Sequence, residues 1–580
     1  MECCRQLDLT GRPPRGRLLI RLLAILLLLG CVPVSGIGQV PAQPTDRTAP
    51  IDQLFAEGQW QEIVRRVGAM PVRSADLDYY YGVALAKIGR SDDARQAFLA
   101  GYHLQPHDKR FPIELAGVDF KQRRYREAAK WLRRALRIDS SDAYANDFLG
   151  TVYFLQGNLE AALKYWNRIG KPGIENVRIE PQLQVDPVLL DRAFAFSPGS
   201  TLELRDFLTA KARCRGLEIF SNYAFGLDAR EDGKFDLTFR AKERNGWGDN
   251  KWEALLSLFR GIFQQTVYPE YFNVDRSAIN IVSLLRWDAQ KRRLDASITG
   301  PLQHSAKRRY GVGLDVRNEN WDIRDSLSGP ALLAALNLRK EAVSAGITSF
   351  ESGRWRWSTG FELSHRDFRG IVPGSVLTPV LLSQGYQLKH LAEFNYQLWR
   401  VPESRFVSTT GASSQIGRIW SQSGHSFLKL QGWFAAHWLP QSSGDDYEMQ
   451  EHVRVGRTFG QVPFDELFML GLEHDNDLWL RAHIGTHDGR KGSAPLGSTY
   501  ALFNWEIDKN LYKNGFLKLK LGPFLDTGKI ADSSSGLGSR KWLWDTGVQA
   551  KVRALGVGII FSYGKDLRSG NNAFYASVGR

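Results

Sequence analysis

One arginine and one aspartate near the C-terminal end of the chain have the chemistry for a strong, directional ion pair. Arg481 belongs to the segment LRAHIG at 480–485, and Asp526 belongs to FLDTG at 524–528. A guanidinium can donate two parallel hydrogen bonds to a carboxylate, so a buried pair would fix the segment that carries the arginine. Two interpretations remain open: the pair only stabilises the fold, or its release is part of a functional switch.

The segment that ends near Asp526 alternates between apolar and polar residues. Its odd positions are Leu517, Leu519, Leu521, Pro523 and Leu525, and its even positions are Phe516, Lys518, Lys520, Gly522, Phe524 and Asp526. A period of two predicts a β-strand with an aliphatic face and a largely polar face. This pattern is typical of a membrane β-barrel strand, with lipid outside and a wet lumen inside. Asp526 would then face the lumen, where a loop folded inward could bring Arg481 to it.

The C-terminal half of the chain repeats this strand pattern. Alternation recurs at 500–507, 547–555 and 557–563, in segments near ten residues long with aromatic residues at their ends. Such segments suit tilted membrane strands with an interfacial aromatic girdle. We therefore predict an antiparallel transmembrane β-barrel over 248–580, with sixteen strands at roughly 20 residues per strand and connection. The segment 252–268 is compatible with either a strand or a helix.

The N-terminus has the organisation of an export signal. An apolar stretch at 22–29 follows Arg12, Arg15, Arg17 and Arg21, and small residues come after it. A basic region, a short apolar core and small residues predict a signal peptide over 1–36, because the core is too short to span a bilayer stably. Cleavage after Gly36 and lipoprotein processing at Cys31 remain alternatives. Beyond this region the sequence holds one cysteine, Cys214, from which neither a disulfide framework nor a metal cluster can be built.

Residues that follow the signal repeat with a period of 34. Three columns of equivalent positions are visible: Gly82, Ala116 and Gly150; Ala94, Ala128 and Ala162; and Phe98, Leu132 and Trp166. Small residues at fixed points allow two helices to approach closely, and the third, large column fills the gap between neighbouring hairpins. The period and the columns resemble the tetratricopeptide repeat (TPR), which predicts an α-helical solenoid over 50–172. Such solenoids bind extended peptides or partner proteins.

A small α/β pattern lies between the repeats and the predicted barrel. Residues 193–196 predict a short strand, 202–213 an amphipathic helix, and 221–227 and 235–244 two strands joined by a turn. This order, directly before a barrel, resembles a polypeptide-transport-associated (POTRA) domain over 185–244. A sheet edge in such a module can accept an extra strand from a passing chain. A purely structural spacer is the alternative interpretation.

Five motifs of the C-terminal third occur in a recognisable order. They are FDELFMLG at 464–471, LRAHIG at 480–485, APLG at 494–497, FLDTGKI at 524–530 and Phe574-Tyr575. Together they resemble the BamA/TamA and two-partner-secretion superfamily of outer-membrane protein transporters, the bacterial surface antigen type. The resemblance implies that Arg481, on an inward-folded loop, contacts Asp526 on a lumen-facing strand, with Phe524 and Gly528 beside it. The chain departs from the family pattern at Ala482, where the family has glycine, and at Arg580, where it has an aromatic residue.

The sequence lacks the motifs of the common enzyme classes. It contains no His-Glu-x-x-His, no Gly-x-Ser-x-Gly and no phosphate-binding loop ending in Gly-Lys-Ser/Thr. Three histidines, His474, His483 and His487, lie near Asp475, Asp477 and Asp488, where ordinary loop polarity is favoured over a metal site. The formal charge is +14, but lysine and arginine are dispersed, with no basic helix or RNA-binding motif. We expect no enzyme, no cofactor and no nucleic-acid partner.

The resemblance and the domain order predict a transport function. We expect a barrel in the bacterial outer membrane that inserts proteins into that membrane or translocates them across it. Its N-terminal domains would lie in the periplasm, where the repeats recruit client proteins or accessory proteins. The alternatives are a dedicated two-partner-type secretion pore and a barrel that anchors a TPR scaffold without transport. A passive porin is disfavoured because it needs no repeat or transport module.

Overall fold

The computed structural model describes residues 50–248, 251–324, 331–372, 376–420, 424–440, 446–514, 517–532, 537–554 and 557–579. The predicted signal peptide at 1–36, with Cys31 and Gly36, lies outside these residues, as does Arg580. Two compact units are present. The first comprises the chain up to Val177, Pro198–Leu204 and Leu227–Leu237, and the second comprises Arg178–Ser197, Arg205–Gly226 and Thr238–Arg580.

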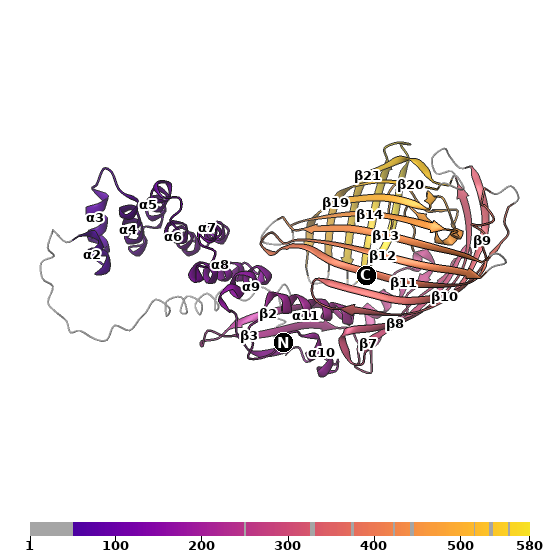
Figure 1. Cartoon of the computed structure of the whole chain (residues 1–580), viewed down its shortest axis with the longest axis horizontal. Coiled ribbons are helices and arrows are strands. Elements are labelled where there is room, and N and C mark those ends of the chain that lie inside the picture. Colours follow the sequence, from indigo (N-terminus) through magenta and orange to yellow (C-terminus); the bar gives the residue numbers. More distant parts are fainter. Residues whose placement is uncertain are drawn as a thin grey trace, which may run out of the picture. The chain divides into compact units, whose positions relative to one another are not determined.

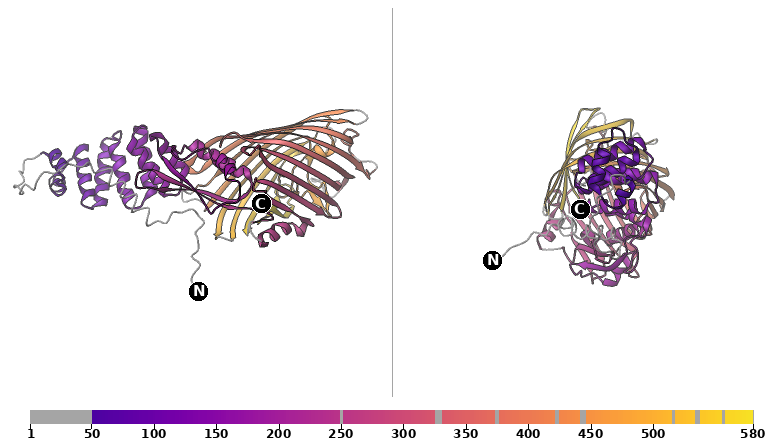
Figure 2. Two further views of the ribbon diagram at one scale, coloured as in Figure 1. Left: turned by 90° about the horizontal axis from the view of Figure 1, so that it is seen from below. Right: turned by 90° about the vertical axis from the view of Figure 1, so that its left-hand side faces the viewer.

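From residue 50 on, the described N-terminal part of the first unit consists of eight α-helices that follow one another in a row (Figures 1 and 2). They are α2 (Ile51–Ala56), α3 (Trp60–Gly68), α4 (Ala75–Lys87), α5 (Ser91–Leu104), α6 (Arg110–Lys121), α7 (Tyr125–Ile138), α8 (Ala143–Leu155) and α9 (Leu159–Trp166). A Cβ atom added to Gly82 of α4 would lie 2.5 Å from the ring of Phe98 on α5. One added to Gly150 of α8 would lie 2.4 Å from Trp166 on α9. The small first column of the repeat therefore packs directly against its large third column.

A small α/β module follows the helices. It contains β1 (Ile174–Glu180), α10 (Pro187–Ala193), α11 (Leu204–Leu217), β2 (Phe220–Ala229) and β3 (Phe235–Glu243), and its three strands form a sheet in the order β1-β3-β2. The two strands predicted at 221–227 and 235–244 are confirmed as β2 and β3.

The strand predicted at 193–196 is wrong, because helix α10 occupies the preceding residues and ends at Ala193. Asp186 caps that helix and Pro187 begins it, which is a favourable start for a helix. Phe194 and Phe196 are buried by aromatic packing, with the Phe194 ring 5.2 Å from that of Phe239, and not by strand pairing. The first strand of the module is β1, which lies before the predicted boundary at 185.

The second unit is dominated by one large antiparallel sheet that curls into a barrel (Figure 1). The strands before the long loop are β4 (Thr266–Val267), β5 (Glu270–Val274), β6 (Ile279–Trp287), β7 (Lys291–Leu302), β8 (Ser305–Arg324), β9 (Leu332–Phe350), β10 (Trp355–Arg369), β11 (Gly385–Val401), β12 (Phe406–Trp420), β13 (His425–Trp438) and β14 (Tyr447–Gly460). The strands after it are β19 (Thr499–Lys513), β20 (Leu517–Ala531), β21 (Ser539–Ala554), β22 (Val557–Asp566) and β23 (Asn572–Gly579). Helix α12 (Lys251–Phe259) precedes β4, so the ambiguous segment at 252–268 is mainly helical.

Neighbouring strands pair in sequence order, except that β4 and β5 both pair with β6 and that β14 pairs with β19. The sheet contains 18 strand segments, which include short strands of the long loop, so the predicted number of sixteen stays a prediction. Among the residues that the structure describes, no helix is both long and apolar enough to cross a bilayer.

The barrel strands present opposite chemistry on their two faces. On β20 and β21, Leu521 and Val548 are 46% and 52% exposed, whereas Asp526 is fully buried and Gln549 is 2% exposed. Large apolar side chains are likewise exposed on the other strands, for example Ile416, Val455 and Phe561. Alternation along each strand therefore places an apolar surface outside and a polar surface inside, as the sequence pattern predicted.

Candidate functional site

A long connection between β14 and β19, residues 461–498, folds into the barrel and is called the inward loop here. It contains the short strands β15 (Phe468–Met469), β16 (Thr486–His487), β17 (Arg490–Lys491) and β18 (Leu496–Gly497). Apolar loop residues such as Phe468, Leu470 and Leu480 are buried in one cluster with Tyr500 and Leu543 of the barrel strands. The loop is thus packed like a small core.

Arg481 and Asp526, which the sequence singled out, lie in direct contact. The Nε and Nη2 atoms of Arg481 donate to the two carboxylate oxygens of Asp526 over 2.8 and 2.7 Å. The backbone N–H of Arg481 donates to the same carboxylate over 3.1 Å. Arg481 is 3% exposed and Asp526 is fully buried. This is the bidentate geometry that a guanidinium makes best.

Residues around the pair satisfy its remaining hydrogen-bonding groups. Arg481 Nη1 donates to Glu506 on β19 and to Gln549 on β21, each over 2.8 Å. Asn504 Nδ2 donates to Asp526 over 2.8 Å. The guanidinium carbon lies 3.9 Å from the centre of the Phe524 ring, which adds a cation–π contact. Although burial opposes its charge, the bond to Asp526 and the charge of Glu506 raise the pKa of Arg481, which therefore stays protonated.

Gly528, the other predicted residue, gives room for the inward loop instead of touching the arginine. A Cβ atom at this position would lie 3.1 Å from Leu470 of the loop. Ala482, where the family pattern has glycine, does not have a left-handed backbone in the structure. Its N–H donates to Asp545 on β21 over 2.7 Å, so alanine fits this turn without strain.

A second set of ionic contacts, which the sequence did not reveal, holds the inward loop two residues further on, at His483. His483 Nδ1 lies 3.1 Å from Asp545, and its Nε2 lies 3.8 Å from Asp566 on β22. In the strand register Asp526 is opposite Asp545, and Asp545 is opposite Asp566. Like charges opposite each other destabilise a sheet, so this row of carboxylates needs the two loop cations. This row of three aspartates could be identified only once the strand register was known.

The histidines of the inward loop do not share one site. His474 contacts the Tyr268 hydroxyl at 2.6 Å, and burial lowers its pKa to about 4. His487 pairs with the exposed Asp488 at 3.0 Å. His483, Asp545 and Asp566 are close enough to hold a cation. However, the two ring nitrogens of His483 face different carboxylates, an arrangement that suits an imidazolium bridging two anions better than a metal ion.

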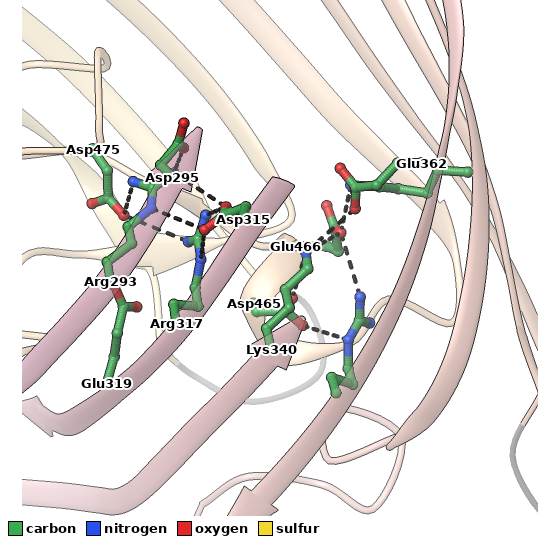
Figure 3. A network of polar contacts seen from close by, with 12 residues as sticks. Arg293, Asp295, Asp315, Arg317, Glu319, Lys340, Glu362, Asp465, Glu466 and Asp475 are labelled. Carbon is green, nitrogen blue, oxygen red and sulfur yellow. Dashed lines mark hydrogen bonds and ion pairs between the residues drawn. The ribbon is translucent and has the colours of Figure 1, made fainter. Parts of the chain in front are cut away.

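The other end of the inward loop carries acids that meet cations of the barrel (Figure 3). These cations project from strands between β7 and β13 and are called the basic wall here. They are Arg293, Arg317, Lys340, Arg366, Lys389 and Lys429. Glu466 of the loop lies 2.9 Å from Lys389 and 3.5 Å from Arg366. Asp475 lies 3.5 Å from both Arg293 and Arg317. Burial would raise the pKa of Glu466, but the surrounding cations hold it well below its usual range.

The opposite side of the lumen is acidic. Glu506, Asp526, Asp545 and Asp566 project from β19 to β22 and are called the acidic wall here. The inward loop therefore has two charged ends: Asp465, Glu466 and Asp475 pair with the basic wall, and Arg481 and His483 with the acidic wall. Charge complementarity at both ends defines one position of the loop in the lumen.

Gly564 on β22 provides a direct test of loop docking. A Cβ atom there would lie 2.4 Å from the carbonyl oxygen of Arg481, a backbone atom that cannot swing away. We expect Gly564→Ala to lower the free energy of unfolding by about 1–3 kcal/mol, typical of overpacking. Denaturant unfolding in detergent measures the change. The control is Gly432→Ala on β13, where the nearest atoms are 3.8 Å away; an equal loss in both variants would contradict this role.

The bridge through His483 predicts a pH dependence of loop docking. Burial disfavours the charged ring, but the bond to Asp545 and the charges of Asp545 and Asp566 raise the pKa of His483 above its ordinary value of 6.5. A raised pKa means that this stabilisation is complete below pH 6.5 and is lost as pH rises through the folded-state value. We expect His483→Gln to flatten the unfolding free energy over that alkaline interval. An unchanged pH profile in this variant would exclude His483 as its source.

Comparisons with known proteins yield only distant likenesses. No family model and no curated protein matches the chain. Among solved structures, BamA from Haemophilus ducreyi lacking POTRA domains 1–3 covers 70% of this chain and 85% of its own, at 11% identity and a TM-score of 0.41. CdiB from Escherichia coli covers 70% and 76%, at 12% identity and a TM-score of 0.46.

Proposed function

We propose that the protein is an outer-membrane β-barrel that inserts proteins into the membrane or translocates them across it. The observation that carries the proposal is the inward loop, which lies in the lumen and is held at its two ends by opposite charges. Ionic and hydrogen-bonded contacts can be exchanged for equivalent contacts with a passing polypeptide, whereas a covalent or purely apolar closure could not. A loop held in this way can give up its place and return.

The exposed faces of the strands support the membrane location. Tryptophans near strand ends are exposed: Trp287 of β6 by 45%, Trp399 of β11 by 59% and Trp420 of β12 by 50%. Aliphatic side chains between such positions are exposed as well, for example Val343 and Leu363 at 53% and 52%. An apolar surface of this extent is unfavourable in water and suits acyl chains, with the aromatic residues at the interfaces.

The helices α2–α9 supply the proposed recruiting part. Their 34-residue repeat and the packing of Gly82 on Phe98 and of Gly150 on Trp166 support a TPR-like solenoid. The sheet of β1, β2 and β3 supports a POTRA-like role, in which an edge strand accepts an extended client segment. In this proposal both parts lie in the periplasm, and clients or accessory proteins bind there.

Reconstitution tests the proposed function. The protein in liposomes should accelerate the insertion of an unfolded β-barrel client, measured by the protease-resistant, folded client, over empty liposomes. A dedicated secretion pore would instead move an exported chain into the vesicle interior without folding it into the bilayer. A barrel that only anchors a scaffold would do neither, and failure of both assays would contradict the proposal. Arg356→Ala, which removes a half-exposed ion pair with Glu393, serves as the matched control variant.

A further inference from the structure

Helix α12 has its polar and apolar faces arranged in the reverse of the usual surface helix. Trp252, Leu256, Phe259 and Phe263 recur at the spacing of one helix face and continue into the turn that follows. They are 74%, 44%, 43% and 100% exposed. A helix on the surface of a soluble protein turns such a stripe toward the core. Here the stripe points away from the protein.

Two polar side chains of the same segment, Ser257 and Arg260, face the barrel and hold the helix there. Arg260 Nη2 donates to Glu270 on β5 over 2.7 Å, and both side chains are nearly buried. Ser257 donates to the same carboxylate over 3.1 Å. The guanidinium carbon of Arg260 also lies 3.9 Å from the centre of the Tyr268 ring. The orientation of α12 is therefore fixed by its polar contacts, so its apolar stripe cannot turn inward.

The surface next to α12 has the same chemistry. Leu285 and Trp287 on β6 are 44% and 45% exposed, and Phe574 on β23 is 62% exposed. The segment after the helix joins these two regions, because Gln264 Nε2 donates to the carbonyl of Ala576 on β23 over 3.1 Å. The apolar stripe of α12 is thus continuous with the apolar outer face of the first and last parts of the sheet.

We propose that α12 and its following turn, residues 251–263, lie within the bilayer edge, with acyl chains in contact with Trp252, Leu256, Phe259 and Phe263. The inference rests on the proposed membrane barrel, whose outer face it extends. A lipid surface fits because the stripe is wide, wholly apolar and continuous with the strand surface, and because Lys251 at the first position can reach the headgroups. In this position the helix covers the outside of the region where β23 approaches β4.

Site-directed spin labelling tests this placement. Nitroxides are attached to Leu256→Cys and Phe259→Cys in a full-length chain whose four native cysteines are replaced by alanine. The protein is reconstituted in phosphatidylethanolamine–phosphatidylglycerol vesicles, and collision rates with oxygen and with a water-soluble nickel chelate are compared. We expect the oxygen-to-nickel ratio at both positions to be several-fold higher than at Val72→Cys, a control that is 84% exposed on the helical part. Both side chains are partly exposed, at 44% and 43%, so these substitutions remove only part of their packing.

Leu521→Cys on β20, 46% exposed, separates the inference from the proposed function. A high ratio at 521 together with a nickel-accessible α12 would overturn the inference alone. A nickel-accessible 521 would overturn the membrane barrel itself. Low collision rates with both reagents at 256 and 259 would show that a protein surface covers the stripe. Dipolar broadening between labels would show that a second copy covers it. Either result would also overturn the inference.

Discussion

Arg481→Ala is expected to lower the free energy of unfolding by about 3–5 kcal/mol and to release the tip of the inward loop. The substitution leaves the buried Asp526 and the partly buried Glu506 without the guanidinium that now binds both. Removing one partner of a buried, hydrogen-bonded ion pair typically costs this much. Denaturant unfolding in detergent gives the free energy, and trypsin cleavage after Lys491, which is 2% exposed in the intact loop, reports release.

Arg481→Lys and Arg356→Ala are the controls for this result. Lysine keeps the charge but cannot form the fork to Asp526, so it should recover only part of the loss. Arg356 forms an exposed pair with Glu393, and its removal should change stability by no more than about 1 kcal/mol. If Arg481→Ala and Arg356→Ala unfold alike, the buried pair does not hold the loop.

Glu466→Gln is expected to have a comparable effect at the opposite end of the inward loop. The carboxylate of Glu466 faces Lys340, Arg366 and Lys389 within 2.9–3.5 Å. The neutral amide leaves these buried cations facing one another, with Asp465 and Glu362 as their remaining acids. We expect a loss of about 3–5 kcal/mol in unfolding free energy, by the same reasoning as for Arg481. Unfolding in denaturant, with salt varied, measures it.

Glu341→Gln is the matched control, because Glu341 is half-exposed and pairs with the half-exposed Arg339 on the same strand, β9. That change should stay within about 1 kcal/mol. The Arg481 and Glu466 substitutions together should cost less than the sum of the single changes if both act by releasing one loop. Strict additivity would indicate that the two ends dock independently and would contradict the single docked loop.

The local patterns of this chain were readable from the sequence. Alternation predicted which face of β20 carries Asp526. The family resemblance, based on the order of the motifs, predicted that Arg481 contacts it. The 34-residue columns predicted which residues pack together, as Gly82 and Phe98 do. For the strand face and the repeat columns the information lies within one strand or one repeat, where a fixed period of side-chain direction is enough.

The rest of the site depends on contacts between distant strands. Asp545 and Asp566 enter it because the register places them beside Asp526, and a register cannot be read from one strand. Gly564 matters because the backbone of Arg481 passes over it. The basic wall is assembled from single residues of separate strands. In the sequence of its own strand, each of these residues has the pattern of an ordinary lumen-facing charge. The strand predicted at 193–196 failed for another reason: two alternating phenylalanines satisfy a strand pattern and aromatic packing equally well.

The distribution of charge connects fold and proposed function. The lumen has a basic wall and an acidic wall, and the inward loop carries the complementary charge at each end. This gives the loop a defined position without making it permanent, since each contact is polar. Whether the pair of Arg481 and Asp526 also acts as a switch stays a prediction.

The most direct test of this account is whether the inward loop leaves the lumen when a client passes. A cysteine at Ala482, 9% exposed, is placed in the cysteine-free chain and treated with a maleimide-polyethylene glycol in reconstituted vesicles. A cysteine at Asp488, whose side chain is 80% exposed, is the loop control and should react at all times. We predict that position 482 is protected at rest and reacts at least about tenfold faster while a client is arrested in transit. Equal protection with and without an actively transported client would contradict the account.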